Sequence, residues 1–178
     1  PANICTPTYL ADTARKIARE FKLKVQVLER KQMEALKLIP GYAAEFREVF
    51  GRDSGGLTHT YKADDAETMV VAMGSLLGTI KDVIDEMRAA GHKIGVLGIT
   101  LFRPFPIAQV REALHGAQRV VVLEKSLAVG LGGILATNVR MALSALPIDV
   151  YTVVAGIGGR PITMRSLHAL FREAERDD

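Results

Sequence analysis

The stretch from Thr68 to Glu124 constrains the fold of this chain more than any other part of the sequence. It contains three short apolar runs, rich in β-branched residues, that begin at Thr68, Ile94 and Arg119. Such runs are typical of strands that are buried on both faces of a parallel sheet. The two segments between them carry apolar residues three and four positions apart, which predicts helices. The order strand–helix–strand–helix–strand therefore predicts a βαβαβ unit with right-handed crossovers.

The same alternation continues toward the end of the chain. A helix is predicted over residues 134–146, a fourth parallel strand over residues 148–154, and a last helix over residues 163–175. Glycine-rich loops at residues 126–133 and 155–161 join these elements. The predicted fold class is therefore α/β, a three-layer α/β/α domain around a mostly parallel sheet of at least four strands.

The N-terminal third is predicted to be mainly helical. Thr6 and Pro7 predict a helix start, because a capping hydroxyl followed by proline favours the first helical turn. This helix is expected to end near Glu20. Residues 23–27 alternate between apolar and polar side chains, which predicts a half-exposed strand.

Two further helices are predicted before the α/β domain. One covers residues 31–39 and is expected to stop at Pro40 and Gly41, since these residues break helices. The other covers residues 42–50 and is expected to end at Gly51 in a left-handed cap.

The predicted domain boundary follows these helices. Residues 1–50 are expected to form an N-terminal extension or linker, and residues 51–178 the α/β domain. Residues 51–61 hold three glycines and no hydrophobic periodicity, which predicts a loop. Residues 64–67 (DDAE) are expected to begin a helical turn with a capping box.

The composition narrows the classes of function. The formal net charge is +3, and no basic stripe interleaves with aromatic residues, so nucleic-acid binding is not expected. The one cysteine, Cys5, excludes a disulfide within the chain and a cysteine-ligated iron–sulfur cluster built from this chain alone. No apolar run approaches the roughly 20 residues that span a bilayer, and no signal peptide is recognisable. A cytoplasmic location is therefore expected.

The loops that follow the predicted parallel strands are the expected site. In open parallel sheets, ligands and partners meet the loops at the carboxyl ends of the strands. Four loops qualify, and each contains glycines, a charge or both, which suits close approach of another backbone or a phosphate. The candidate interface or ligand-facing residues are Gly74, Ser75, Arg103, Phe105, Lys125, Ser126, Gly130, Gly132, Gly133, Gly158 and Arg160.

Several features in these loops admit a functional and a structural interpretation. The two GxGG stretches do not complete a dinucleotide-binding motif, because Leu135 and Pro161 occupy the last glycine position, so we favour tight turns and helix-start packing. Glu124 could act as a general acid or base; we favour a structural role, pairing with Lys125 or capping the next loop. Arg103 could contact a carboxylate or phosphate of a substrate; we favour a structural ion pair.

No catalytic or metal-binding constellation is recognisable in the sequence. The four histidines, His59, His92, His115 and His168, do not show metal-ligand spacing. No arrangement of serine, histidine and aspartate suggests a catalytic triad, so we assign no catalytic residue and no metal ligand.

The central stretch also resembles a known family. The segments MGSLLGTIKDVIDEMRAAGHKIGVLGITLFRPFP and RVVVLEKSLAVGLGG resemble the C-terminal, transketolase-type domain of thiamine-diphosphate enzymes. The segment GRDSGGL from Gly51, together with Tyr61, residues 64–67 and the sequence Arg-Pro-Phe-Pro from Arg103, is more similar to the alpha subunit (domain II) of the pyruvate:ferredoxin oxidoreductase family. The similarity covers roughly two thirds of the chain, from about Glu48 to about Leu170.

The resemblance implies a function that the residues alone do not. Enzymes of this family convert a 2-oxoacid and coenzyme A into an acyl-CoA and CO₂, using thiamine diphosphate with Mg²⁺ and iron–sulfur clusters. It also implies that these cofactors lie outside this chain and that the partners are thiamine-diphosphate-binding beta, iron–sulfur and gamma subunits, with ferredoxin or a related acceptor. The resembling alpha subunits are longer, and a start at Pro1 is expected of a fragment or a processed product.

Two alternatives remain open at this stage. The chain could be a non-catalytic binding or regulatory module that reuses the transketolase C-terminal fold, since no catalytic set is recognisable. It could also be an E1-type or transketolase component, although the Pro-Phe-Pro turn at residues 104–106 argues against that interpretation.

Overall fold

The computed structural model describes residues 7–25 and 38–176, and the chain divides into two compact units, Pro1–Leu38 and Ile39–Asp178. In the first unit, helix α1 (Pro7–Glu20) begins and ends where the sequence predicts. Residues 23–25 of the predicted strand are not in a strand, and the rest of it lies outside the described residues. Residues 31–37 of the next predicted helix also lie outside the described residues. A domain boundary after residue 50 stays a prediction.

Helix α3 (Leu38–Phe50) corrects one expectation. Pro40 and Gly41 were expected to stop a helix, but they lie inside the first turn of α3. Proline is tolerated there because the first amide groups of a helix have no partner within the helix. The predicted cap is confirmed, since Gly51 has a φ of 63° and its N–H donates to the carbonyl of Arg47 at 2.8 Å.

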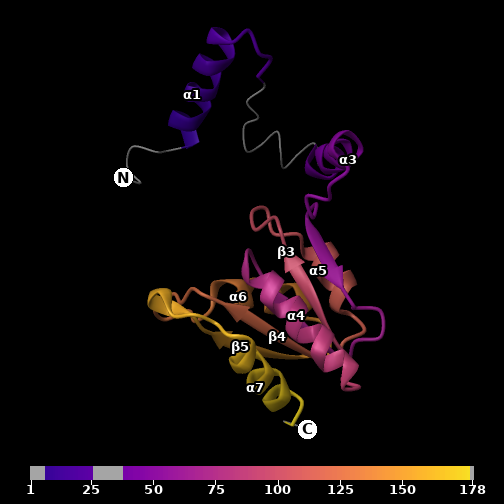
Figure 1. The fold of residues 1–178 in the computed structure, drawn as a ribbon. Coiled ribbons are helices and arrows are strands. Elements are labelled where there is room, and N and C mark those ends of the chain that lie inside the picture. The colour runs from indigo at the N-terminus through magenta and orange to yellow at the C-terminus, as the bar shows by residue number, and fades with distance from the viewer. Residues whose placement is uncertain (1–6, 26–37, 177–178) are drawn as a thin grey trace. The chain divides into compact units, whose positions relative to one another are not determined.

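The second unit is built around a five-stranded sheet in the order β1-β3-β2-β4-β5 (Figure 1). The strands β2, β3, β4 and β5 are parallel, which confirms the predicted mostly parallel sheet, and β1 pairs antiparallel with β3. The bounds are β1 Thr58–Tyr61, β2 Thr68–Ala72, β3 Ile94–Ile99, β4 Arg119–Glu124 and β5 Asp149–Val154.

Strand β1 and the turn after it differ from the prediction. Residues 51–61 were predicted as a loop, but Thr58 to Tyr61 pair with β3, Thr58 opposite Ile99. The prediction failed because this short edge strand has no apolar periodicity and follows three glycines. The expected capping box at residues 64–67 is also wrong. Residues 64 and 65 form a turn, and Glu67 instead makes an ion pair with Lys93 at 2.7 Å.

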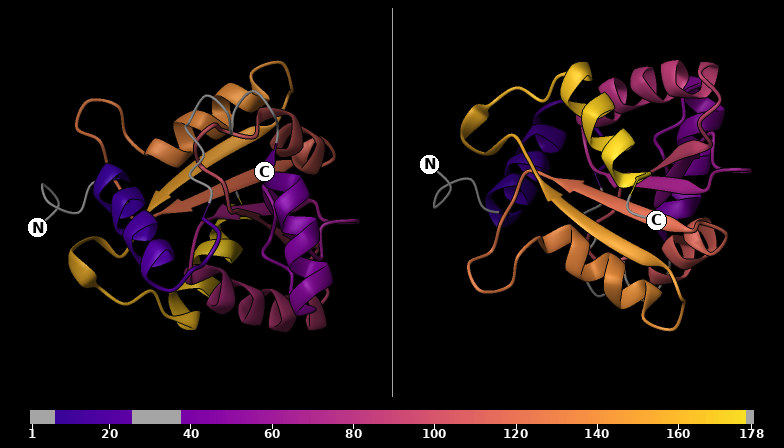
Figure 2. Two further views of the ribbon diagram at one scale, coloured as in Figure 1. Left: turned by 90° about the horizontal axis from the view of Figure 1, so that it is seen from above. Right: turned by 90° about the horizontal axis from the view of Figure 1, so that it is seen from below.

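Two pairs of helices cover the sheet, so the domain has the predicted three layers (Figure 2). Helices α4 (Leu76–Ala89) and α7 (Met164–Ala174) lie on one face, and α5 (Ile107–Leu114) and α6 (Ile134–Leu143) lie on the other. Alternate residues of each central strand point to opposite layers. In β2, Met69 and Val71 pack with α5 and α6, whereas Val70 packs with α4 and α7. Because both faces are buried, the central strands read as continuous apolar runs.

The connections leave β2 and β4 in opposite directions. The chain passes from β2 through α4 to β3 on one side, and from β4 through α6 to β5 on the other. Adjacent strands whose connections diverge in this way create a crevice at their carboxyl ends, which is where open α/β sheets bind ligands and partners.

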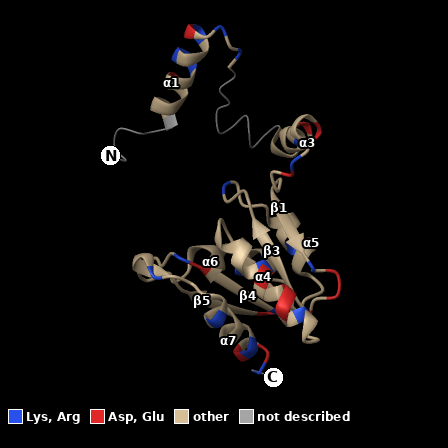
Figure 3. Ribbon diagram, in the orientation of Figure 1, with Lys and Arg blue, Asp and Glu red and all other residues tan. Residues whose placement is uncertain are grey.

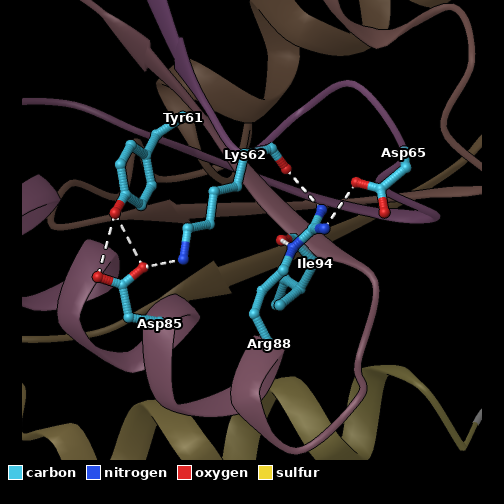
Figure 4. A network of polar contacts seen from close by, with 6 residues as sticks. All are labelled: Tyr61, Lys62, Asp65, Asp85, Arg88 and Ile94. Atoms are coloured by element: carbon cyan, nitrogen blue, oxygen red, sulfur yellow. Dashed lines mark hydrogen bonds and ion pairs between the residues drawn. The ribbon is translucent and has the colours of Figure 1, made fainter.

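At the opposite end of the domain, Arg88 of α4 makes hydrogen bonds to three other residues (Figure 4). Its guanidinium donates to the carbonyl of Ile94 at 2.7 Å, to the carbonyl of Lys62 at 2.7 Å, and to the carboxylate of Asp65 at 2.6 Å. One side chain therefore ties α4 to the start of β3 and to the turn between β1 and β2. A planar group with several fixed donors suits this task better than an ammonium group does.

Asp85, one turn earlier on α4, anchors the same turn. Its carboxylate accepts from the Tyr61 hydroxyl at 2.8 Å and pairs with the Lys62 ammonium at 2.6 Å. The hydrogen bonds from Lys62 and Tyr61 lower the pKa of Asp85 below 3.8.

We expect Arg88→Met to lower the free energy of unfolding by about 2 to 4 kcal/mol, because it leaves two main-chain carbonyls without a strong donor. Chemical denaturation at neutral pH measures the effect. Arg165→Met, at an exposed position of α7, serves as the control and is expected to change stability by less than about 0.5 kcal/mol. Equal effects of the two substitutions would contradict the role given to Arg88.

We expect Asp85→Asn to make the free energy of unfolding fall less steeply as the pH is lowered into the acid range. Since the pKa of Asp85 is lower in the folded than in the unfolded chain, the stabilisation by its ionised carboxylate is fully present above the unfolded value, about 3.9, and is lost as the pH falls through the lower folded value. Urea unfolding at a series of pH values should show a shallower acid limb for the variant than for Asp82→Asn, an exposed position on the same helix. Identical limbs would contradict this assignment.

Candidate functional site

A cavity of about 300 Å³ lies in the crevice between the carboxyl ends of β2 and β4. We call this cavity, with the residues that line it, the switch-point cavity. Most of its lining is apolar, and the polar groups come from the end of β4 and the loop after it. The lining residues are Met73, Leu76, Phe102, Leu123, Glu124, Lys125, Ser126, Ile134 and Leu135.

Glu124 forms the polar part of the cavity wall and caps α6. Its carboxylate accepts from the main-chain N–H groups of Leu135 at 2.8 Å and Ala136 at 3.0 Å, and from the Ser126 hydroxyl at 3.3 Å. The residue is only 6% exposed, so its negative charge is compensated by the positive end of the α6 dipole. The favoured structural role of Glu124 is therefore confirmed, although the group that it caps is helix α6 rather than the loop before it or Lys125.

Gly133 is required by the position of the Glu124 carboxylate. A Cβ atom on Gly133 would lie 2.0 Å from Oε1 of Glu124, which is far inside van der Waals contact. Gly133 itself has an ordinary extended backbone conformation. The last glycine of the first GxGG stretch thus gives space to a carboxylate at the start of α6, in agreement with the predicted role in helix-start packing.

Arg103 lies beside the cavity and is held by neutral groups. Its guanidinium lies 4.0 Å from the centre of the Phe102 ring, a cation–π contact, and donates to the amide oxygen of Asn138 at 3.2 Å. Phe105 packs edge-to-face on Phe102, with ring centroids 6.1 Å apart. The structural ion pair favoured for Arg103 is therefore wrong. Its partner on α6 is the neutral amide of Asn138 instead of a carboxylate.

The other predicted residues occupy the same end of the sheet without lining the cavity. Gly74, with a φ of 71°, and Ser75 make the turn from β2 into α4. Gly130 and Gly132 have φ values of 81° and 82° and shape the loop before α6. Gly158 and Arg160 belong to the short 3₁₀ helix η1 (Ile157–Gly159) and to its end.

Sequence reasoning missed the apolar lining of the cavity. Met73, Phe102 and Ile134 each stand next to a predicted loop residue, and each is partly exposed at a strand or helix end. Large apolar residues in such positions are a usable signal, because a strand end that faces solvent normally changes to polar residues.

A second cavity, of about 220 Å³, lies between α3 and β1. The ring of His59 lies against Gly98, where a Cβ atom would be 2.4 Å from His59 Cε1. Burial, and then the positive charge of Lys81, lower the pKa of His59 below 6.5. The lowered pKa favours the neutral imidazole. The described residues that line this cavity do not complete a catalytic arrangement with His59, so we assign the site to the switch-point cavity.

The described residues do not fit a metal–diphosphate site. Residues 7–25 and 38–176 hold no group of three or more histidine, cysteine, aspartate and glutamate side chains that could bind a metal ion. The one carboxylate in the lining of the switch-point cavity already accepts two main-chain amides. We therefore derive no chemical step that involves thiamine diphosphate or Mg²⁺ from this chain.

The fold and the crevice define an α/β domain of the transketolase C-terminal type. A solved split-gene transketolase, described as an inactive beta4 tetramer, has the same fold, with a TM-score of 0.52 and 20% sequence identity. The similarity covers 69% of this chain and 42% of that one.

Sequence comparisons identify the family. The family model of pyruvate:ferredoxin oxidoreductase core domain II matches residues 66–167. The pyruvate synthase subunit PorA of Methanosarcina barkeri is 44% identical over 151 residues, which are 83% of this chain and 38% of that protein. The ketoisovalerate oxidoreductase subunit VorA of Pyrococcus horikoshii is 33% identical over 160 residues, 88% of this chain and 40% of that protein. The chain therefore belongs to the pyruvate:ferredoxin oxidoreductase family, and it spans about two fifths of the length of these relatives.

No helix among the described residues is both long enough and apolar enough to span a lipid bilayer.

We expect Gly133→Ala to destabilise the domain by about 1 to 3 kcal/mol, because the new methyl group displaces the Glu124 carboxylate from the α6 amides. Thermal unfolding measures the effect. Gly78→Ala, inside α4 and with no atom within 4 Å of the new Cβ, is the matched control and is expected to stabilise by about 0.5 to 1 kcal/mol. A neutral Gly133→Ala would contradict the close approach of Glu124.

Proposed function

We propose that this chain is core domain II, with a preceding linker, of the alpha subunit of a thiamine-diphosphate-dependent 2-oxoacid:ferredoxin oxidoreductase. The complete enzyme converts a 2-oxoacid and coenzyme A into an acyl-CoA and CO₂, and passes two electrons to ferredoxin or a related acceptor. Membership of the family and the similarity to pyruvate synthase and ketoisovalerate oxidoreductase subunits support this proposal.

The domain contributes structure and an interface rather than reacting groups. The observation that carries this assignment is the switch-point cavity. It lies where α/β sheets meet their partners, yet its one buried carboxylate serves to cap α6. Thiamine diphosphate, Mg²⁺ and iron–sulfur clusters are accordingly held elsewhere in the complex.

We also propose the domain bounds of this chain and its partners in the complex. Residues 1–50 form the linker and residues 51–178 the domain. The partners are thiamine-diphosphate-binding beta, iron–sulfur and gamma subunits, and the complex is cytoplasmic. The residues that face other parts of the complex are those predicted from the sequence: Gly74, Ser75, Arg103, Phe105, Lys125, Ser126, Gly130, Gly132, Gly133, Gly158 and Arg160.

Isolation of the tagged chain from its native source under anaerobic conditions tests this function. We expect a brown complex that contains thiamine diphosphate, iron and sulfide and that reduces a viologen dye when a 2-oxoacid and coenzyme A are both present. The matched control omits coenzyme A, which should abolish sustained turnover. A colourless chain that purifies alone would contradict the proposal and favour a module that reuses the fold.

A further inference from the structure

The loops at the carboxyl ends of the parallel strands carry basic residues and no acidic ones. We call residues 73–75, 100–106, 125–133 and 155–163 the strand-end loops. They contain Arg103, Lys125 and Arg160 and not one aspartate or glutamate (Figure 3). The neighbouring Glu124 is buried and compensated by α6. We call Arg103, Lys125 and Arg160, which follow parallel strands at the same end of the sheet as the switch-point cavity, its basic rim.

The strand-end loops also expose apolar side chains. The loop before α6 is closed by a hydrogen bond from Ala128 N–H to the Gly132 carbonyl at 2.8 Å. It presents Leu127, Val129 and Leu131, which are 57%, 99% and 72% exposed. Ile157, in the next strand-end loop, is 51% exposed. Exposed apolar groups gathered at one end of a domain and rimmed by charges mark an interaction surface.

The interior of the cavity calls for an apolar occupant. Among the described residues, the buried side-chain polar atoms without a hydrogen-bond partner are Thr152 Oγ1 and His168 Nδ1, and neither residue lines the cavity. No buried polar group in the lining is thus left for a polar ligand, and the other charged lining residue, Lys125, is exposed. At about 300 Å³ the cavity is at the lower limit of small-molecule sites, a size that suits one large side chain.

We propose that the switch-point cavity and its basic rim bind an acidic polypeptide segment of a partner subunit. One large aliphatic or aromatic side chain of that segment enters the cavity, and neighbouring aspartate or glutamate residues pair with Lys125 and Arg160. The inference rests on the proposed function, and it specifies the chemistry of the interface. An aromatic or aliphatic anchor in a desolvated pocket supplies most of the binding energy of such contacts, and the charges set their rate and specificity.

Two sets of substitutions separate the contributions of charge and cavity. Lys125→Glu with Arg160→Glu reverses the rim, and Ile134→Trp fills the mouth of the cavity from a residue that is 39% exposed. Arg172→Glu with Arg176→Glu repeats the charge change on exposed residues in the last turn of α7 and just after it. Met141→Trp repeats the bulky change at an exposed position of α6 that does not line the cavity.

The experiment measures binding of each full-length variant to the co-expressed partner subunits of the same source, after thermal unfolding has shown that the variant is folded. We expect the rim reversal to weaken binding at least about tenfold at about 50 mM NaCl and much less at about 500 mM, because salt screens exposed charges. We expect Ile134→Trp to weaken binding about tenfold at both salt concentrations, and both controls to stay within about twofold of the unaltered chain.

Each other outcome overturns the inference. If the unaltered chain joins an active complex and the rim and cavity variants bind equally well, the inference fails while the proposed function stands. If the unaltered chain binds heparin or anionic vesicles through the rim and does not bind the subunits, the occupant is not a polypeptide. If no complex or 2-oxoacid-dependent activity is found at all, the proposed function fails and the inference fails with it.

Discussion

The hydrogen bonds between Glu124 and the amino end of α6 fix the geometry of the domain at the carboxyl ends of its parallel strands. The carboxylate that ends β4 accepts two main-chain amides of α6, at 2.8 and 3.0 Å. This contact brings the helix back against the strand that precedes it, and Gly133 makes the approach sterically feasible. Because the connection after β2 leaves in the other direction, the anchored α6 forms one wall of a crevice and α4 begins the other.

The same contact decides what the crevice can do. A buried carboxylate without partners would be costly, and it would be the natural candidate for acid–base chemistry. Here its oxygens are occupied by donors that belong to the fold. The groups that remain for an external molecule are the apolar lining and the basic side chains of the strand-end loops. A surface of that kind is the basis for the interface role proposed above.

The central α/β unit could be predicted from the sequence because its strands are buried on both faces and its helices on one. The apolar runs that begin at Thr68, Ile94 and Arg119 became β2, β3 and β4, and the helices between them were placed correctly. Strand β1 could not be predicted in this way. Its four residues form an edge whose pairing depends on β3, more than thirty positions later in the chain.

The loops around the candidate site could be predicted from the sequence, but the apolar lining of the cavity could not. The position of the loops after parallel strands follows from topology alone, which singled out Lys125 and Ser126. The cavity itself depends on how Met73, Phe102 and Ile134 pack, and these residues come from three separate parts of the chain. Their packing cannot be predicted from their order in the sequence. The stop expected at Pro40 failed for a local reason, since proline is unfavourable in a helix only beyond its first turn.

The pairing of β1 with β3 has a consequence for the order of assembly during synthesis. The ribosome releases β1 before β2, α4 and β3, so β1 is exposed while its partner strand does not yet exist. The turn that follows β1 is then held by Arg88, a residue that is also translated later. β1 therefore cannot join the sheet until β3 has been made, and until then its unpaired edge is available to other nascent chains.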